Sequence, residues 1–280
     1  MPMRSLRAAF LALTLTFTAC AARVPAAVQQ PAAPAEPSWG TNQIHDFLLN
    51  AKILRGRKTD KGITSPWRLT MTDGTVVHDA AFQTVDQHKI RNDFGDGTVE
   101  LNFVDSYLYD LAAYEMTKLV GLDGMMPVTV LRKWQAQTGA LSWWVPHQMD
   151  ESERLKKEVQ PPPDVHWNDQ MHRMRVFTAL VYDTDRNLTN VLISPDWKLW
   201  MIDFSRAFRL PAKLVNEKDL VKGDRQLLAR IKALDGAEVA RVTKNYLSES
   251  AVEGVMKRRD LIIKHFDDLV AAKGEKEVLY

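Results

Sequence analysis

TDRNLTNVLISPDWKLWMIDF, residues 184–204, is the stretch of sequence that decides the fold. Asp185 lies near its start, Asn190 follows five residues later, and Asp203 lies near its end. Two short apolar runs between them are separated by SPDW, a pattern typical of a β-hairpin. Two interpretations are open at this point: a set of oxygen ligands for a magnesium-bound nucleotide, or an ordinary hairpin with polar ends.

The three polar side chains have the chemistry that phosphoryl transfer requires. That reaction depends mainly on positioning and on neutralising phosphate charge. It needs oxygen ligands for magnesium, which carboxylates and amide carbonyls supply. It also needs a carboxylate that orients the attacking hydroxyl or accepts its proton. We therefore predict that Asp185 is catalytic and that Asn190 and Asp203 bind the metal.

The rest of the folded chain predicts two lobes. Alternating apolar residues predict a pair of antiparallel strands in residues 63–86, and a helix is expected at 106–122. A second helix, at 166–182, leads directly into the quoted hairpin, and the chain beyond it is mostly helical. We expect an α+β fold with a β-rich N-lobe containing one helix (41–148) and a mainly helical C-lobe (149–280), separated by a cleft.

Two polar segments are expected to be loops. Residues 54–66, LRGRKTDKGITSP, are punctuated by glycine, and residues 150–164, DESERLKKEVQPPPD, are charged and rich in proline. Glycine and proline are the strongest local signals for turns and loops. The second segment would connect the two lobes.

The quoted stretch also resembles a known family. TDRNLTNVLI followed by MIDFSRAF is similar to the catalytic and metal-binding segments of the atypical protein-kinase-like superfamily. The pattern is nearest to the type II phosphatidylinositol 4-kinases, and more distant from the secretory-pathway casein kinases and the bacterial persistence-toxin kinases. The resemblance implies a bilobal kinase-like fold with Mg²⁺ and ATP in the cleft. It assigns catalysis to Asp185, metal binding to Asn190 and Asp203, and a hinge near Val145 that contacts the nucleotide.

The chain departs from this family pattern in its cations. Where the family places a lysine that holds the α- and β-phosphates, the matching strand has Gln83, which cannot neutralise phosphate charge. Its helix partner, usually a glutamate, would be Asp110 here, or Glu115 one turn later. We hypothesise that Lys58 or Lys61, in the glycine-flanked GRKTDKG loop, replaces the missing charge. A further departure is Asp183, where a histidine is usual.

The N-terminus is expected to be a targeting sequence. MPMRSLRAAFLALTLTFTAC, residues 1–20, has two arginines and then a short apolar run, which is typical of a signal peptide. Its last four residues resemble the lipobox of bacterial lipoproteins, in which the cysteine, here Cys20, is lipidated. Residues 21–40 are rich in alanine and proline and are expected to form a disordered tether. The resemblance places the protein at the cell envelope, anchored to a bacterial membrane and facing the periplasm or the exterior.

The charge balance excludes one class of partner. Without Arg4 and Arg7 of the expected signal peptide, 35 basic residues balance 35 acidic ones. No basic field attracts DNA or RNA, so no nucleic-acid partner is expected. Cys20 is the only cysteine of the chain, and no zinc-binding spacing of cysteine or histidine occurs.

Three functional hypotheses follow from the sequence. The first is a phosphotransferase that uses Mg-ATP or another nucleotide, with a protein, lipid or small-molecule acceptor. The second is a catalytically silent kinase-like binding module, favoured by Gln83 and by the scarcity of ATP outside the cytoplasm. The third is an envelope lipoprotein without a nucleotide site. Asp185, Asn190 and Asp203 together favour the first.

Overall fold

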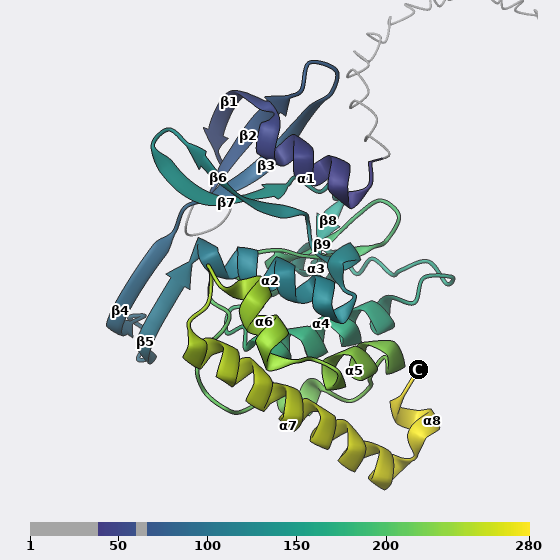
Figure 1. Ribbon diagram of the computed structural model, residues 1–280. Helices are drawn as coiled ribbons and strands as arrows, with labels where there is room; N and C mark the ends of the chain where they lie inside the picture. Colours follow the sequence, from purple (N-terminus) through teal and green to yellow (C-terminus); the bar gives the residue numbers. More distant parts are fainter. Residues whose placement is uncertain (1–38, 60–65) are drawn as a thin grey trace, which may run out of the picture. The chain divides into compact units, whose positions relative to one another are not determined.

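The computed structural model describes residues 39–59 and 66–280 of the chain (Figure 1). The expected signal peptide, the lipidation site at Cys20 and nearly all of the expected tether lie outside the described residues, as does Lys61. These assignments stay predictions from the sequence. No helix in the described ranges is long and apolar enough to cross a membrane.

An antiparallel five-stranded sheet, with strand order β1-β2-β3-β7-β6, forms the first half of the described chain. Its strands are β1 (Lys52–Lys58), β2 (Trp67–Thr72), β3 (Val77–Gln83), β6 (Thr129–Trp134) and β7 (Gln137–Trp143). Residues that are direct partners across an antiparallel pair lie on the same face of the sheet. The register therefore assigns each side chain of β2 and β3 to one of two faces.

Helix α1 (Thr41–Asn50) covers one face of this sheet. Phe47 of the helix packs edge-on against Trp143 of β7, with ring centroids 5.7 Å apart. Arg132 of β6 donates to the carbonyl of Ala51 at 2.6 Å, just past the end of α1. A helix leaves its last carbonyl groups without internal partners, so Arg132 satisfies one of them and fixes α1 on the sheet.

The opposite face of the sheet carries partly exposed side chains. Arg68 of β2 and Ala81 of β3 are cross-strand partners there, and Gln83 lies two residues further along β3. Arg68 donates to the carboxylate of Asp79 on the same face at 2.5 Å. Because these side chains are only partly buried, this face keeps the accessible surface that a ligand would need.

Helix α2 (Tyr107–Val120) follows a separate two-stranded ribbon made of β4 (Asp86–Asp93) and β5 (Val99–Ser106). Figure 1 shows this ribbon extending away from the five-stranded sheet. The side chain of Ser106 caps α2 by accepting from the amide of Leu108 at 3.3 Å. The ribbon and the helix are thus joined without a loop.

The second half of the described chain is mainly helical. Its longer helices are α4 (Trp167–Val181), α5 (Arg225–Lys232), α6 (Gly236–Thr243) and α7 (Glu249–Lys273), with short helices α3 (Glu151–Lys156) and α8 (Glu275–Val278). The expected hairpin is present as β9 (Val191–Ile193) and β10 (Leu199–Met201), which form a small sheet with β8 (Met149–Asp150). The structure therefore confirms the α+β fold, with a β-rich first part and a helical second part.

Both segments that were expected to be loops contain regular structure. β1 occupies part of residues 54–66, although it is an edge strand whose side chains are almost all exposed. An exposed edge strand has no apolar alternation, so the sequence carries no periodic signal for it. α3 lies within residues 150–164, where the side chain of Asp150 accepts from the amide of Glu153 at 2.8 Å and starts the helix.

Candidate functional site

The site begins two residues after the end of helix α4, at Asp183, whose side chain is fully buried. Its carboxylate accepts from Arg186 Nε at 2.9 Å and from the backbone amide of Asp185 at 2.9 Å. A buried carboxylate is costly unless it is paired and hydrogen-bonded. Arg186, whose side chain is only 6% exposed, supplies that pairing. The pair holds the turn on which Asp185 stands.

Arg186 also joins the two halves of the site through backbone carbonyls. Its Nη1 donates to Asn190 O at 3.0 Å and to Ile202 O at 2.6 Å, and its Nη2 donates to Asp203 O at 3.0 Å. The guanidinium lies over the ring of Phe204, 4.1 Å from the centroid. The loop that carries Asn190 is therefore fixed to the segment that carries Asp203.

Asp185 is held through its backbone, while its side chain remains 46% exposed. Its carbonyl accepts from Asn190 Nδ2 at 3.4 Å, which leaves the amide oxygen of Asn190 as an acceptor for another group. The Oδ2 of Asp185 lies 3.6 Å from Arg206 Nη1. A half-exposed carboxylate on a rigid turn can orient a hydroxyl group and accept its proton.

Asp203 lies at a backbone position that is unusual for its residue type. Its φ of 59° is in the left-handed region, which non-glycine residues adopt rarely and mostly where the surroundings enforce it. One carboxylate oxygen accepts from Ser205 Oγ at 3.0 Å. The residue keeps accessible surface, yet the surrounding protein raises its pKa through desolvation. An added positive charge at this carboxylate would offset that penalty.

Asp110, predicted as the helix partner of the position that Gln83 occupies, contacts the Asp203 segment. It projects from helix α2 and is buried, and its Oδ1 accepts from the amide of Phe204 at 2.7 Å. Burial, followed by the nearby charge of Asp203, raises the pKa of Asp110 well above its ordinary value. α2 is thereby attached to the residue that follows Asp203.

Gln83 and Lys58, which are also predicted to contact the nucleotide, lie on different faces of the sheet. Gln83 lies on the partly exposed face of β3, where its Oε1 accepts from the amide of Thr84 at 3.2 Å. Lys58 is the cross-strand partner of Trp67, and its Nζ lies 5.7 Å from that ring. Trp67 in turn pairs with Phe82. Because Phe82 and Gln83 are consecutive on a strand, the register puts Lys58 and Gln83 on opposite faces.

Val145, the predicted hinge residue, lies between β7 and β8 and is buried. Its carbonyl contacts a ring nitrogen of His147 at 3.0 Å. A contact of Val145 with a nucleotide stays a prediction.

A cationic cluster that the sequence analysis did not identify lies beside Asp185. Arg206 Nη2 donates to Glu100 Oε2 at 3.0 Å, and Arg209 forms an ion pair with the other carboxylate oxygen of Glu100. Glu100 lies on β5, more than 100 positions away in the chain, so only the folded structure reveals the contact. The sequence did contain one signal, because SRAFR places both arginines directly after Asp203.

The oxygen donors of the site fit magnesium. Mg²⁺ is usually held by one or two protein carboxylates together with water and substrate phosphates. Asp203 and the amide oxygen of Asn190 supply such a sparse donor set. The described part of the chain has no group of three or more His, Cys, Asp or Glu side chains arranged for a metal.

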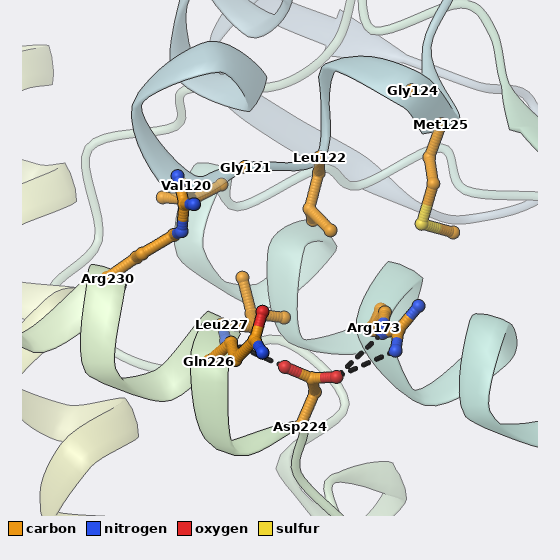
Figure 2. A pocket seen from close by; sticks show the side chains of 10 residues that line it. All are labelled: Val120, Gly121, Leu122, Gly124, Met125, Arg173, Asp224, Gln226, Leu227 and Arg230. Atoms are coloured by element: carbon orange, nitrogen blue, oxygen red, sulfur yellow. Dashed lines mark hydrogen bonds and ion pairs between the residues drawn. The ribbon is translucent and has the colours of Figure 1, made fainter.

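Two cavities lie elsewhere in the molecule. One, of about 190 Å³, lies between the end of α2 and helices α4 and α5, where Arg173 pairs with Asp224 (Figure 2). The other, of about 490 Å³, is lined mainly by α1 and by Trp39. Neither cavity is lined by a predicted site residue.

Comparison with solved structures gives the fold its name. The chain is similar to hydra Fam20 with sugar (TM-score 0.63, 12% identity, 86% of this chain and 92% of that chain). It is also similar to the Golgi casein kinase (TM-score 0.59, 13% identity, 85% and 78%). A third structure, the Helicobacter pylori proinflammatory kinase CtkA, has a TM-score of 0.48 at 10% identity, over 82% of this chain and 97% of that chain.

At the sequence level, no protein-family profile matches the chain, and no curated protein sequence matches it. The structural similarity therefore establishes the protein-kinase-like fold. It confirms the expected kinase-like fold. The nearer likeness to type II phosphatidylinositol 4-kinases stays an inference from the sequence.

Proposed function

We propose that this protein is a phosphotransferase that moves the terminal phosphoryl group of Mg-ATP to an acceptor hydroxyl. The observation that carries the proposal is the set of bonds made by Arg186, which fixes the Asn190 and Asp203 segments together while the Asp185 side chain stays half exposed beside them. An ordinary hairpin with polar ends would not need a buried ion pair at its base.

The residues have separate roles in this reaction. The acceptor oxygen forms a bond to the terminal phosphorus, and the bond from that phosphorus to the bridging oxygen breaks, releasing ADP. The hydroxyl proton moves to the carboxylate of Asp185. Asn190 and Asp203 would hold Mg²⁺, which neutralises phosphate charge when bound.

A silent binding module is the second candidate, because Gln83 lies where a lysine would neutralise phosphate. In this case Mg-ATP or another nucleotide would bind without being turned over. For either function we also propose the envelope location and the lipid anchor at Cys20, which rest on the sequence of residues 1–20. The acceptor class stays open among proteins, lipid headgroups and small molecules.

Thermal unfolding with Mg-ATP, combined with ATP turnover, tests the proposal. A ligand that binds only the folded state raises the melting temperature by mass action. We expect Mg-ATP to raise the melting temperature for the parent and for Asp185→Asn, but much less for Asp203→Ala. Among these three proteins, we expect turnover only in the parent. Arg241→Met, a surface change on α6, serves as the control that should behave like the parent.

The two candidates give different results in this experiment. A rise in melting temperature without turnover in the parent would support the silent module. No rise with ATP, GTP or AMP would contradict both candidates.

A further inference from the structure

We infer that Arg206 supplies the positive charge that β3 lacks at Gln83, and that it binds the terminal phosphate of the nucleotide beside Asp185. The inference rests on the proposed function and names a residue that the sequence resemblance did not assign. It concerns the phosphate end of the site, where the kinase-like fold is present but the usual lysine is not.

The position of Arg206 is the first argument. Its Nη1 lies 3.6 Å from Asp185 Oδ2, and its Nη2 lies 3.0 Å from Glu100 Oε2. The transferred phosphoryl group must pass within bonding distance of the hydroxyl that Asp185 orients. A cation beside Asp185 is therefore also beside that phosphoryl group. Charge neutralisation at this point is what phosphoryl transfer demands.

The hydrogen-bonding capacity of Arg206 is the second argument. A guanidinium has five N–H donors in a planar fork that matches phosphate. The 3.6 Å separation from Asp185 is an ion pair but too long for a hydrogen bond. Nη1 therefore makes no hydrogen bond to that carboxylate, and its N–H groups are the donors that phosphate oxygens would engage.

The orientation of the side chain is the third argument. Arg206 is only 18% exposed. Its guanidinium carbon lies 5.1 Å from the ring centroid of Phe94 and 5.3 Å from that of Phe103, both carried by the β4–β5 ribbon. Glu100 on the same ribbon fixes the other side of the guanidinium. A held guanidinium loses less entropy on binding phosphate than a free surface arginine.

Other cations around the site are less suited to this role. The donors of Arg186 go to Asp183 and to three backbone carbonyls. Arg209 is buried against Glu100 and donates to a carbonyl of β5. Arg68 pairs with Asp79 and lies over the ring of Trp144. Arg186 and Arg68 are thus engaged with protein partners, and the side chain of Arg209 is less accessible than that of Arg206, with 7% exposed against 18%.

Arg57 is the strongest competitor. It is the cross-strand partner of Arg68, so it lies on the partly exposed face of the sheet, and it is solvent-exposed. An exposed side chain on an edge strand is not held in one orientation, and no contact joins it to Asp185 in the described chain. Arg57→Met is therefore a comparison variant with the same change in charge.

The test is the binding of Mg-ATP and of AMP to the full chain, measured by calorimetric titration. We expect Arg206→Met to weaken Mg-ATP binding about 10- to 100-fold, because charge-assisted hydrogen bonds to phosphate are lost. AMP, which lacks the terminal phosphate, should bind equally well to the parent and to Arg206→Met. Arg57→Met should bind both nucleotides as the parent does.

A rescue variant separates lost charge from lost structure. In the double variant Arg206→Met with Gln83→Lys, a lysine is restored on β3, and we expect at least part of the Mg-ATP affinity to return. If Arg206→Met fails to fold, two milder variants replace it. Arg206→Lys keeps the charge on a shorter side chain, and Glu100→Gln removes the carboxylate that holds the guanidinium of Arg206. Both variants should show a smaller loss of Mg-ATP affinity, again without a loss for AMP.

The possible outcomes distinguish the role of Arg206 from the proposed function. Equal Mg-ATP affinity of the parent and Arg206→Met overturns the role of Arg206 and leaves the proposed function standing. A loss in Arg57→Met but not in Arg206→Met assigns the charge to β1 instead. Absence of Mg-ATP binding to the parent overturns the inference and the proposed function together. Equal losses for Mg-ATP and AMP would show a general structural defect and contradict the phosphate role.

Discussion

The helical side and the sheet side of the candidate site are built in opposite ways. On the helical side, Asp183 and Arg186 are buried, and their bonds fix the backbone of Asn190 and Asp203. On the sheet side, Gln83 lies on a partly exposed face and is neutral. The comparison indicates that the rigid framework of the site, and the arginine held beside Asp185, lie on the helical side.

The largest effect is expected from Arg186→Met. The substitution leaves the carboxylate of Asp183 buried without its cation, and breaking a buried ion pair in this way costs about 3–5 kcal/mol. It also removes the three carbonyl contacts that join the two segments of the site. Urea denaturation should show a large decrease in the free energy of unfolding.

Arg241→Met is the control for this prediction. Arg241 also pairs with a carboxylate three residues away, Glu238, but on the surface of α6. Exposed pairs contribute little because water and salt screen them, so little change is expected. If the two substitutions had similar effects, the helical side of the site would not be the framework described here.

Arg258→Met should have the next largest effect. Arg258 of α7 is fully buried and donates to Leu180 O at 2.8 Å and to Arg209 O at 2.9 Å, so it fixes the chain at both ends of the site. Burial lowers the pKa of Arg258 to about 10. Loss of its bonds should destabilise the protein by about 2 kcal/mol, since the carbonyls are left unsatisfied.

A measurement of Mg-ATP affinity shows whether Arg258 positions the site as well as stabilising the fold. Mg-ATP affinity measured well below the melting temperature should fall as well, because Arg209 and its neighbours lose an anchor. A variant that is destabilised but binds Mg-ATP as the parent does would show that α7 stabilises the fold without positioning the site.

The sequence predicted this framework in part, and the reason lies in which interactions are local. The hairpin, its Asp-Asn-Asp pattern and helix α4 are encoded within about 40 consecutive residues, so periodicity and spacing could reveal them. The pairing of Glu100 with Arg206 joins β5 to the segment after Asp203, and no local pattern encodes such a contact. Similarly, β1 is defined by its backbone bonds to β2 rather than by its own apolar residues.

The role of Asp183 illustrates the same limit. Its sequence position showed only that a histidine was missing. The structure shows a buried carboxylate that pairs with Arg186. The sequence predicted Asp110 as the helix partner of Gln83 and gave no sign that it accepts from the amide of Phe204. In both cases the residue was noticed, but its contact depends on how distant segments fold together.

Asp110→Asn should change the pH dependence of stability. The pKa of Asp110 is raised in the folded state, so the folded protein binds this proton more tightly than the unfolded chain does. The contribution of Asp110 to stability therefore falls as the pH rises above the unfolded value, about 3.9. Asparagine stays neutral and keeps an oxygen for the amide of Phe204.

The measurement is urea denaturation without magnesium, at pH 4.5 and pH 7.5. Asp110→Asn should be more stable than the parent at pH 7.5, and the gain should be smaller at pH 4.5. A gain that is independent of pH, or one that is larger in acid, would contradict the buried carboxyl with a raised pKa described for α2.

Gln83→Lys in the otherwise unchanged protein should have the smallest effect. If Arg206 already neutralises the terminal phosphate, a lysine on β3 adds charge where the requirement is largely met. We expect the Mg-ATP affinity to rise by only a few-fold, corresponding to under about 1 kcal/mol. An increase of 100-fold or more would show that the sheet side lacks a charge that no other residue supplies.

The central claim is that Asp203 and Asn190 hold a divalent cation on a nucleotide. Its most direct test is calorimetric titration of a non-hydrolysable ATP analogue into the full chain, with and without Mg²⁺, comparing the parent with Asp203→Asn. We predict binding that strengthens at least tenfold with Mg²⁺ in the parent and does not respond to Mg²⁺ in Asp203→Asn. Binding that is equally strong with and without Mg²⁺ in the parent, or equally enhanced in Asp203→Asn, would contradict the claim.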